Sequence, residues 1–346
     1  MNCAYSAQAA QAARRHWYSV AKPLNSLGVL EDMVVKLAGI QGTEQVEIDR
    51  RCCLTFCADN GVVQEGVTQT DSSVTASVAR SIARGTGNIC QMARVARCDV
   101  FPVDVGMLQK VDDPRVFDRR VAAGTGNIAI GPAMTPDQCR AAIRAGEELV
   151  CGMAEKGYKL IATGEMGIGN TTTASAVACA LTGEAVTRMT GRGAGLSDEG
   201  LGRKRAAIER ALNVNRPDPQ DARDVLMKVG GFDIAAMVGA FLGGAKCGVA
   251  VLVDGFISSV AALCAQRMMP ETKDFMLATH VSREPAGALM LEALGLTPVI
   301  TAGMALGEGT GAVAAMPLLD MALAVYRGAT FDDIKVRAYQ PFGGGA

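Results

Sequence analysis

Two glutamates of this sequence lie inside glycine-rich turns, where a charged side chain contributes little to folding. Glu165 follows Gly164 in the segment Gly-Glu-Met-Gly-Ile-Gly-Asn, and Glu308 lies between Gly307 and Gly309. A glutamate that loses its water in a cleft has a raised pKa and can act as a general base. For Glu308, the alternative is a helix-start glutamate stabilised by the helix dipole. The two turns therefore indicate acid–base chemistry by carboxylates.

The first of these turns also has the composition of a phosphate site. Its residues Gly167, Ile168, Gly169, Asn170 and Thr171 run from an expected strand into an alanine-rich helix. Glycines let the backbone approach an anion closely, and the first amides of a helix point toward it. The alternative is a tight strand-to-helix turn in which Asn170 or Thr171 caps the helix. The segment matches neither the P-loop nor the dinucleotide-binding pattern.

Further polar segments are candidates for substrate contacts. The basic, glycine-rich residues 188–205 offer cations for a phosphate or carboxylate group, with Lys204 as the candidate point charge. The alternative is a solvated run of charges after a capping serine. Polar turns at residues 254–259 and 282–285 are further candidates for holding a sugar or an aromatic acid.

The sequence offers few metal ligands and few bases other than carboxylates. It has two histidines, His16 and His280, and none of its 11 cysteines belongs to a Cys-x-x-Cys pair. Neither a metal site nor Ser-His-Asp chemistry is therefore expected. Many cysteines lie in apolar stretches, and no secretion signal is expected. We therefore predict buried, reduced thiols, among them Cys57, Cys90, Cys179, Cys247 and Cys264.

Charge and hydropathy argue against several classes of partner. The 346 residues include 34 Lys and Arg against 35 Asp and Glu, so neither a nucleic acid nor an anionic membrane surface is expected as a partner. The longest uncharged run, residues 166–183, is not predominantly apolar, so no transmembrane helix is expected. Charged residues interrupt the first 21 positions, so no signal peptide is expected and we predict a cytoplasmic protein.

Short apolar runs, each followed by a polar or glycine-rich turn, alternate with helical patterns. The runs predict strands at residues 52–57, 100–105, 159–163, 249–253 and 275–278. This alternation is typical of an α/β fold with a Rossmann-like parallel sheet flanked by helices. In such a sheet the ligand binds beyond the carboxyl ends of the strands. The turns after these strands are therefore expected to line one cleft.

Both ends of the chain have helical patterns. Apolar residues recur at spacings of three and four within the first forty residues, and residues 310–327 are similar. We therefore predict two parts. Residues 1–45 and 310–346 form a smaller helical subdomain, and residues 46–309 form a large α/β domain that holds the cleft.

Ordered motifs along nearly the whole chain match one known family. They begin at Lys22-Pro-Leu-Asn-Ser-Leu-Gly-Val-Leu-Glu31, close to the family's Lys-Pro-x-Gly-Ser-Leu-Gly-x-Leu-Glu. The most specific matches are Gly-Glu-Met-Gly-Ile-Gly-Asn-Thr-Thr at 164–172, Gly-Arg-Gly at 191–193, Gly-Gly-Phe at 230–232, Asp-Gly-Phe at 254–256 and Leu-Gly-Glu-Gly-Thr-Gly at 306–311. In these motifs the chain resembles the nicotinate-nucleotide–dimethylbenzimidazole phosphoribosyltransferase family.

The resemblance implies transfer of phosphoribose from nicotinate mononucleotide to an aromatic acceptor, with inversion at the anomeric carbon, for the lower-ligand nucleotide of cobamides. The pyridinium leaving group is already activated, so neither a metal nor another cofactor is expected. By the family's motifs Glu308 is the catalytic base and Glu165 lies near the ribose. The loop from Gly167 to Thr171 would hold the phosphate with Lys204, and Ser282 would contribute to the nucleotide site.

Departures from the family's pattern gather in the predicted acceptor pocket. The family reads Asp-His-Gly where this chain has Asp59-Asn60-Gly61, and Ser where it has Thr68. A Tyr-Pro-x-Glu-Val-Thr-x-Gln-Met pattern becomes residues 70–78, which lose the aromatic ring and the glutamine. A phenol presents one hydroxyl in place of two ring nitrogens, so we hypothesise a phenolic acceptor such as phenol or p-cresol. The residues predicted for this pocket are Asp59, Asn60, Thr68, Ser77 and Leu306.

The sequence is also compatible with other functions. The chain is predicted to act as a dimer, either with itself or with a paralogous subunit, since the resemblance extends to a phenol-activating branch built from unlike subunits. A non-catalytic supporting subunit is one alternative, although such a chain has no need of Glu308. A nucleotide-binding oxidoreductase also fits the α/β pattern but lacks the dinucleotide fingerprint.

Overall fold

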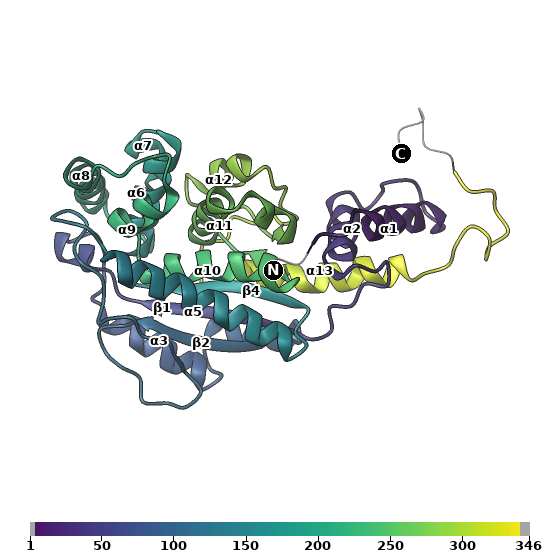
Figure 1. Ribbon diagram of the computed structural model, residues 1–346, viewed down its shortest axis with the longest axis horizontal. Coiled ribbons are helices and arrows are strands. Elements are labelled where there is room, and N and C mark those ends of the chain that lie inside the picture. The colour runs from purple at the N-terminus through teal and green to yellow at the C-terminus, as the bar shows by residue number, and fades with distance from the viewer. Residues whose placement is uncertain (1–3, 340–346) are drawn as a thin grey trace.

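A six-stranded parallel sheet forms the centre of the computed structural model, which describes residues 4–339 (Figure 1). The strand order is β3-β2-β1-β4-β5-β6, and every neighbouring pair is parallel. This is the order of a doubly wound sheet. Strands are added on one side of β1 as far as β3 and then, from β4 onward, on its other side, so the strand order reverses between β1 and β4. The strands are β1 (Arg51–Ala58), β2 (Asp99–Gly106), β3 (Phe117–Asp118), β4 (Leu160–Met166), β5 (Ala250–Val253) and β6 (Met276–Ala278).

Helices lie on both faces of this sheet and at its ends. They are α1 (Ala7–Ser19), α2 (Val29–Gln41), α3 (Ser73–Ala83), α4 (Asn88–Val95), α5 (Pro136–Glu155), α6 (Asn170–Thr182), α7 (Val186–Met189), α8 (Asp198–Asn215), α9 (Ala222–Val229), α10 (Phe232–Cys247), α11 (Phe256–Met268), α12 (Gly287–Leu294) and α13 (Thr310–Tyr326). Two 3₁₀ helices, η1 (Gly61–Glu65) and η2 (Pro270–Phe275), complete the described elements.

The five predicted strands are confirmed, because both faces of the sheet are buried and each strand therefore reads as an apolar run. In β1, Leu54 and Phe56 join the core that includes α5 and α10, whereas Cys53 joins the core on the opposite face with α2, α4 and α13. The sequence missed β3, a two-residue edge strand whose Asp118 is exposed. A strand this short carries no apolar run.

The terminal helices pack together although they are far apart in the sequence. Figure 1 shows α1 and α2 beside α13 at one end of the molecule, with α6 to α9 at the other. The helices α2, α13 and α4 share one apolar core with strands β4, β5 and β6. The division into a helical subdomain and a large domain stays a prediction.

Helices α5 and α10 cross so closely that glycine is required at the contact. A Cβ added at Gly146 would lie 1.8 Å from the Ala236 carbonyl oxygen, and one added at Gly239 would lie 1.8 Å from the Ile143 oxygen. This close approach leaves Cys151 and Cys247 with their Cα atoms 5.5 Å apart, and the two form a disulfide. The prediction of a reduced thiol is therefore wrong at Cys247, while the other described cysteines are free.

No helix within residues 4–339 has both the length and the apolar character needed to cross a membrane.

Candidate active site

A cavity of about 380 Å³ opens at the carboxyl ends of the central strands, where an open parallel sheet binds its ligands. Its walls come from the turns after β4, β5 and β6, from the segment before and within α3, and from the loop before α13. Glu165, Gly167, Ile168, Gly169, Asn170, Thr171, Ser282, Leu306, Glu308 and Thr68 are among the lining residues. Most of the predicted site residues are thus brought together.

Glu308 lies in a backbone segment of three consecutive left-handed residues. Its φ is 62°, between 82° at Gly307 and 91° at Gly309, a region that disfavours any residue with a side chain. The loop is fastened to the sheet, since the Glu308 amide donates to the Glu165 carbonyl at 3.1 Å. On the other side, the Thr55 hydroxyl donates to the Glu308 carbonyl at 3.2 Å. The side chain is therefore held at the ends of β1 and β4.

The carboxyl group of Glu308 is placed for work as a base. The side chain is buried, with 7% of the residue exposed, yet it lines the cavity. Burial raises its pKa above the ordinary glutamate value, and a hydrogen bond from the Ile89 amide to Oε2, at 3.1 Å, opposes this. That amide belongs to the first turn of α4, where the helix dipole favours an anion. The carboxyl group of Glu308 is thus partly desolvated and fixed in place.

Glu165 lies beside this loop at the end of β4. Gly307 packs against it so closely that a Cβ there would lie 2.6 Å from Glu165 Oε1. The Asn170 side-chain amide donates to Glu165 Oε2 and also, at 2.9 Å, to Asp233 Oδ2. Burial, and next the nearby charge of Asp233, raise the pKa of Glu165 well above the ordinary value. Glu165 and Glu308 thus differ in their surroundings although both face the cavity.

The predicted phosphate loop leads directly into the first turn of α6. Gly169 has a φ of 93° and directly precedes the helix. The Ile168 amide donates to the Thr75 hydroxyl at 3.2 Å and the Asn170 amide to the Gly167 carbonyl at 3.0 Å, which leaves the amides of Gly169 and Thr171 as the candidates for an anion. Lys204, on α8, is fully buried and donates to the Thr171 hydroxyl at 2.8 Å. Burial lowers the pKa of Lys204 to about 8, with an opposing effect of Glu284. Lys204 does not itself line the cavity but reaches it through Thr171.

Three of the predicted acceptor residues lie outside the cavity walls. Asp59 is buried and accepts hydrogen bonds from the Thr75 hydroxyl, at 2.6 Å, and the Leu108 amide, at 2.8 Å. Asn60 lies behind the phosphate loop, with its amide 3.4 Å from the Ile168 carbonyl oxygen. Ser77 is exposed, because the cavity side of α3 is formed by Val74 and Val78, four residues apart on the same helix face.

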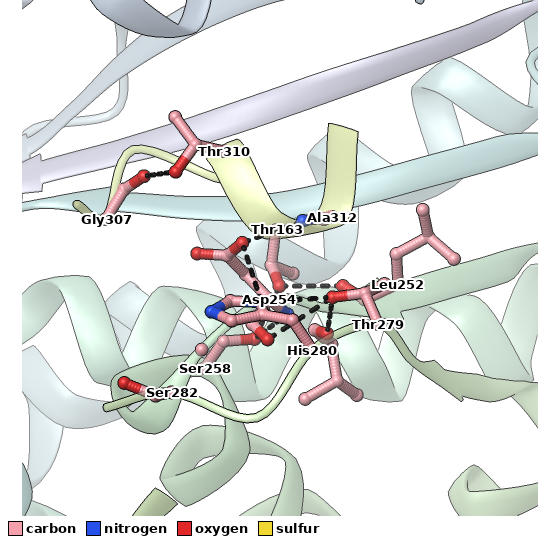
Figure 2. A network of polar contacts seen from close by, with 12 residues as sticks. Thr163, Leu252, Asp254, Ser258, Thr279, His280, Ser282, Gly307, Thr310 and Ala312 are labelled. Carbon is pink, nitrogen blue, oxygen red and sulfur yellow. Dashed lines mark hydrogen bonds and ion pairs between the residues drawn. The ribbon is translucent and has the colours of Figure 1, made fainter. Parts of the chain in front are cut away.

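Asp254 and His280 connect the end of the sheet to the loop that carries Glu308. Figure 2 shows Asp254 between the start of α13 and the imidazole ring. Its Oδ1 accepts the Ala312 amide at 2.8 Å and lies 3.9 Å from His280 Nδ1, while its own amide donates to the Ser258 hydroxyl at 3.1 Å. Asp254 therefore anchors the first turn of α13, directly after Glu308.

The sequence of residues 4–336 matches the family described as Phosphoribosyltransferase. A relative from Acetivibrio thermocellus, named nicotinate-nucleotide–dimethylbenzimidazole phosphoribosyltransferase, is 46% identical over 329 residues, which make up 95% of this chain and 94% of the relative. A relative of the same name from Ruminiclostridium cellulolyticum is 45% identical over 332 residues, 96% of this chain and 94% of the relative. This chain belongs to the nicotinate-nucleotide–dimethylbenzimidazole phosphoribosyltransferase family. It is therefore an enzyme of the pentosyltransferase class.

Solved structures of this phosphoribosyltransferase family have the same fold. CobT from Thermus thermophilus superimposes with a TM-score of 0.91 at 41% identity, covering 95% of this chain and 99% of that one. A second structure of the phosphoribosyltransferase from the same organism gives a TM-score of 0.90 at 40% identity, covering 96% and 99%. The predicted family and the α/β fold class are confirmed.

Two residues with contacts to the phosphoribosyltransferase site were missed by the sequence reasoning. Ile89 contributes only a backbone amide to Glu308, which no side-chain pattern can indicate. Asp233 directly follows the family motif Gly-Gly-Phe, and an acidic residue in the first turn of a helix that begins after a glycine pair was the available signal. Within residues 4–339 of this phosphoribosyltransferase, no cluster of three or more His, Cys, Asp or Glu residues is placed to hold a metal ion.

Proposed function

We propose that this enzyme transfers the phosphoribosyl group of nicotinate mononucleotide to an aromatic base. The observation that carries the proposal is one cavity that holds the buried carboxyl group of Glu308 and, on another wall, the helix-start loop from Gly167 to Thr171. The first suits proton removal and the second suits a phosphate. The names of the similar enzymes support dimethylbenzimidazole as the first acceptor to test.

In this reaction the acceptor nitrogen or oxygen forms a bond to the anomeric carbon of the ribose. The bond from that carbon to the pyridinium nitrogen breaks, and its electron pair leaves with nicotinate. Glu308 takes the proton that the acceptor loses, while Glu165 lies at the ribose. The loop from Gly167 to Thr171, through the amides of Gly169 and Thr171, and Lys204 behind it hold the phosphate. Catalysis by this chain thus consists of positioning and one proton transfer.

A phenolic acceptor is the second candidate, because the acceptor end of the cavity is mostly apolar. Val74, Val78 and Leu306 line it. The Thr68 hydroxyl is directed at the Thr70 carbonyl oxygen at 2.8 Å. A phenol needs only a base for its single hydroxyl, whereas a benzimidazole presents two ring nitrogens. The hydroxyl of an unperturbed phenol has a pKa of about 10, so its proton is hard to remove. The carboxyl group of the buried Glu308 would therefore have to lie close to the phenol hydroxyl.

A competition assay tests the donor and the acceptor together. Purified enzyme is incubated with nicotinate mononucleotide and equal concentrations of dimethylbenzimidazole, phenol and p-cresol, and the ribotides are identified by mass. We expect a ribotide and free nicotinate in equal amounts. An oxygen-linked product identifies the phenolic acceptor, and a benzimidazole product alone contradicts it. Absence of any ribotide contradicts the proposal for this chain alone.

Assembly of the enzyme is part of the same proposal. We infer a dimer, formed either with a second copy or with a paralogous chain, and light scattering of the purified enzyme distinguishes a dimer from a single chain. If the pure chain is inactive, adding the paralogue and recovering the product would identify a supporting role. The buried, loop-held Glu308 argues against that role, since a supporting subunit gains nothing from it.

Binding of the nucleotide is expected to weaken at alkaline pH. Burial lowers the pKa of Lys204 to about 8, so the ammonium form that attracts phosphate is lost as the pH rises through that value. We therefore expect kcat/KM for nicotinate mononucleotide, which reports groups of the free enzyme, to fall above about pH 8. The measurement is a pH series of initial rates.

The variant Lys204→Met separates this effect from other titrations. In this variant kcat/KM should no longer fall above about pH 8, the alkaline limb of the profile. KM should rise by on the order of 10-fold or more, which corresponds to the loss of one charge-assisted hydrogen bond. The exposed Lys110, which pairs with Asp118, provides the control Lys110→Met with an unchanged profile. A limb that persists in Lys204→Met would assign it to another group.

A further inference from the structure

A half-buried carboxyl group at the cavity, that of Glu165, and a fully buried one behind it, that of Asp233, share the amide of a single residue. Asn170 Nδ2 donates to Oε2 of Glu165 and to Oδ2 of Asp233, the latter at 2.9 Å. Asp233 lies in the first turn of α10 and is fully buried. It does not line the cavity, whereas Glu165 and Asn170 do. Asp233 therefore reaches the site only through Asn170.

The backbone leaves this aspartate very little room to move. A Cβ added at Gly167 would lie 2.6 Å from Asp233 Oδ2, and one added at Gly231 would lie 2.7 Å from Oδ1. The Ile234 amide donates to Oδ1 at 3.0 Å. Glycines on both sides and a hydrogen bond from its own helix thus fix the carboxyl group with Oδ2 directed at Asn170.

Glu165 is surrounded by acidic groups from several elements. The charges that act on it are those of Asp233 on α10, Asp254 after β5 and Glu308 before α13, and the Cys57 thiol faces it from β1. Burial and the Asp233 charge raise the pKa of Glu165 well above its ordinary value. Burial also raises the pKa of Asp233, to about 6, although Asn170 and Ile234 donate hydrogen bonds to it. The two carboxyl groups thus compete for one amide donor, and a proton held on one of them relieves the repulsion between them.

We propose that Asp233 is a positioning residue that, through Asn170, fixes the carboxyl group of Glu165 and keeps a proton on it. Glu165 then faces the cavity as a neutral hydrogen-bond donor. A donor fits a ribose hydroxyl oxygen, and a neutral group does not repel the phosphate and carboxylate of the nucleotide. The role of this donor rests on the proposed function, whereas the protonation of Glu165 does not.

A purely structural role for Asp233 explains only part of the geometry. Acidic residues are common in the first turn of a helix, where the dipole stabilises them. That role accounts for Oδ1 and the Ile234 amide. It does not account for Oδ2, which is directed away from the helix start toward Asn170 and is enclosed by Gly167.

The first test compares the pH dependence of kcat/KM for nicotinate mononucleotide in the wild type and in Asp233→Asn. This substitution keeps the shape and removes the charge that, after burial, contributes most to the raised pKa of Glu165, so Glu165 ionises at a lower pH than in the wild type. We expect a loss of about 10-fold at pH 8 that shrinks to about twofold near pH 6, as Glu165 regains its proton. In a Glu165→Gln background, which is permanently neutral, Asp233→Asn should cost less than about twofold.

Asp221→Asn is the matched control, because Asp221 also accepts amides at a helix start, that of α9, without contact to Glu165. The pH dependence of kcat/KM in Asp221→Asn should stay parallel to that of the wild type. A loss in Asp233→Asn that is the same at every pH, or that persists in the Glu165→Gln background, would overturn the proposal and leave Asp233 a structural residue.

The second test observes the proton directly and needs no turnover. Infrared difference spectra at neutral pH should contain the carbonyl stretch of a protonated carboxylic acid, absent in Glu165→Gln and lost or shifted in Asp233→Asn. If this band is absent from the wild type, the proposal is wrong whatever the reaction of the enzyme. If the band is present but no ribotide forms, the proposed function fails and the protonation of Glu165 stands.

Discussion

Replacing Glu308 by glutamine should lower turnover by on the order of 100-fold or more, the contribution of a general base. Glutamine has nearly the same shape and can still accept the Ile89 amide with its carbonyl oxygen, but it cannot take a proton at neutral pH. Binding of nicotinate mononucleotide should remain close to that of the wild type. Turnover is measured from ribotide formation, and binding by calorimetry.

The pH dependence of kcat in the wild type tests the same assignment, that of Glu308 as the base. Only the carboxylate form of Glu308 can accept a proton, and burial raises its pKa above the ordinary value of about 4.3. The acidic limb of kcat should therefore lie at a higher pH than that of an exposed glutamate, and Glu308→Gln should lack it. The exposed residue Glu47 provides the control Glu47→Gln. Turnover of Glu308→Gln within a few-fold of this control would remove Glu308 from the mechanism.

Gly164→Ala should damage activity almost as strongly, although Gly164 does not line the cavity. A Cβ at this position would lie 2.3 Å from the Glu308 carbonyl oxygen and 2.6 Å from its carbonyl carbon. Both atoms are backbone, so the loop must move away from β4 and carry the base with it. A displacement of about 1 Å costs on the order of 100-fold in rate, and overpacking costs roughly 1–3 kcal/mol of stability.

A matched alanine substitution distinguishes crowding at the loop from a general effect of the new methyl group. Gly152 lies within α5 and has nothing within 4 Å of an added Cβ. Gly152→Ala should leave turnover unchanged and stabilise the enzyme by up to about 1 kcal/mol through helix propensity. Thermal unfolding and kcat are measured for both variants. Equal turnover in the two would show that the Glu308 loop tolerates displacement.

Much of the fold was predictable because its signals are local. Each buried parallel strand is an apolar run, so the five longer strands could be located from composition alone, and the glycine-flanked Glu165 and Glu308 were recognisable as unsuited to folding. Contacts between segments that are distant in the sequence could not be predicted. The hydrogen bond from the Ile89 amide to Glu308 spans 219 positions, and a backbone donor leaves no mark on the choice of residue.

The same reasoning explains why the disulfide and the position of Ser77 were not predicted. The disulfide between Cys151 and Cys247 follows from the crossing of α5 and α10, which glycines on both helices allow. Neither cysteine has a local pattern that indicates this pairing. Ser77 was assigned to the acceptor pocket by its place in a motif, yet α3 presents Val74 and Val78, and not Ser77, to the cavity. The rotation of a helix about its own axis depends on how it packs against the rest of the protein, and a sequence motif does not include that information.

The left-handed backbone at Glu308 has an evolutionary consequence. That conformation costs a residue with a side chain roughly 1–2 kcal/mol, whereas glycine adopts it freely. One nucleotide change converts a glutamate codon to a glycine codon, so a duplicated gene released from selection for turnover lies a single step from a protein that folds better and has no base. The nucleotide loop would be untouched by that step. A single base change at this codon thus suffices to relieve the disfavoured backbone conformation and to remove the carboxyl group at the same time.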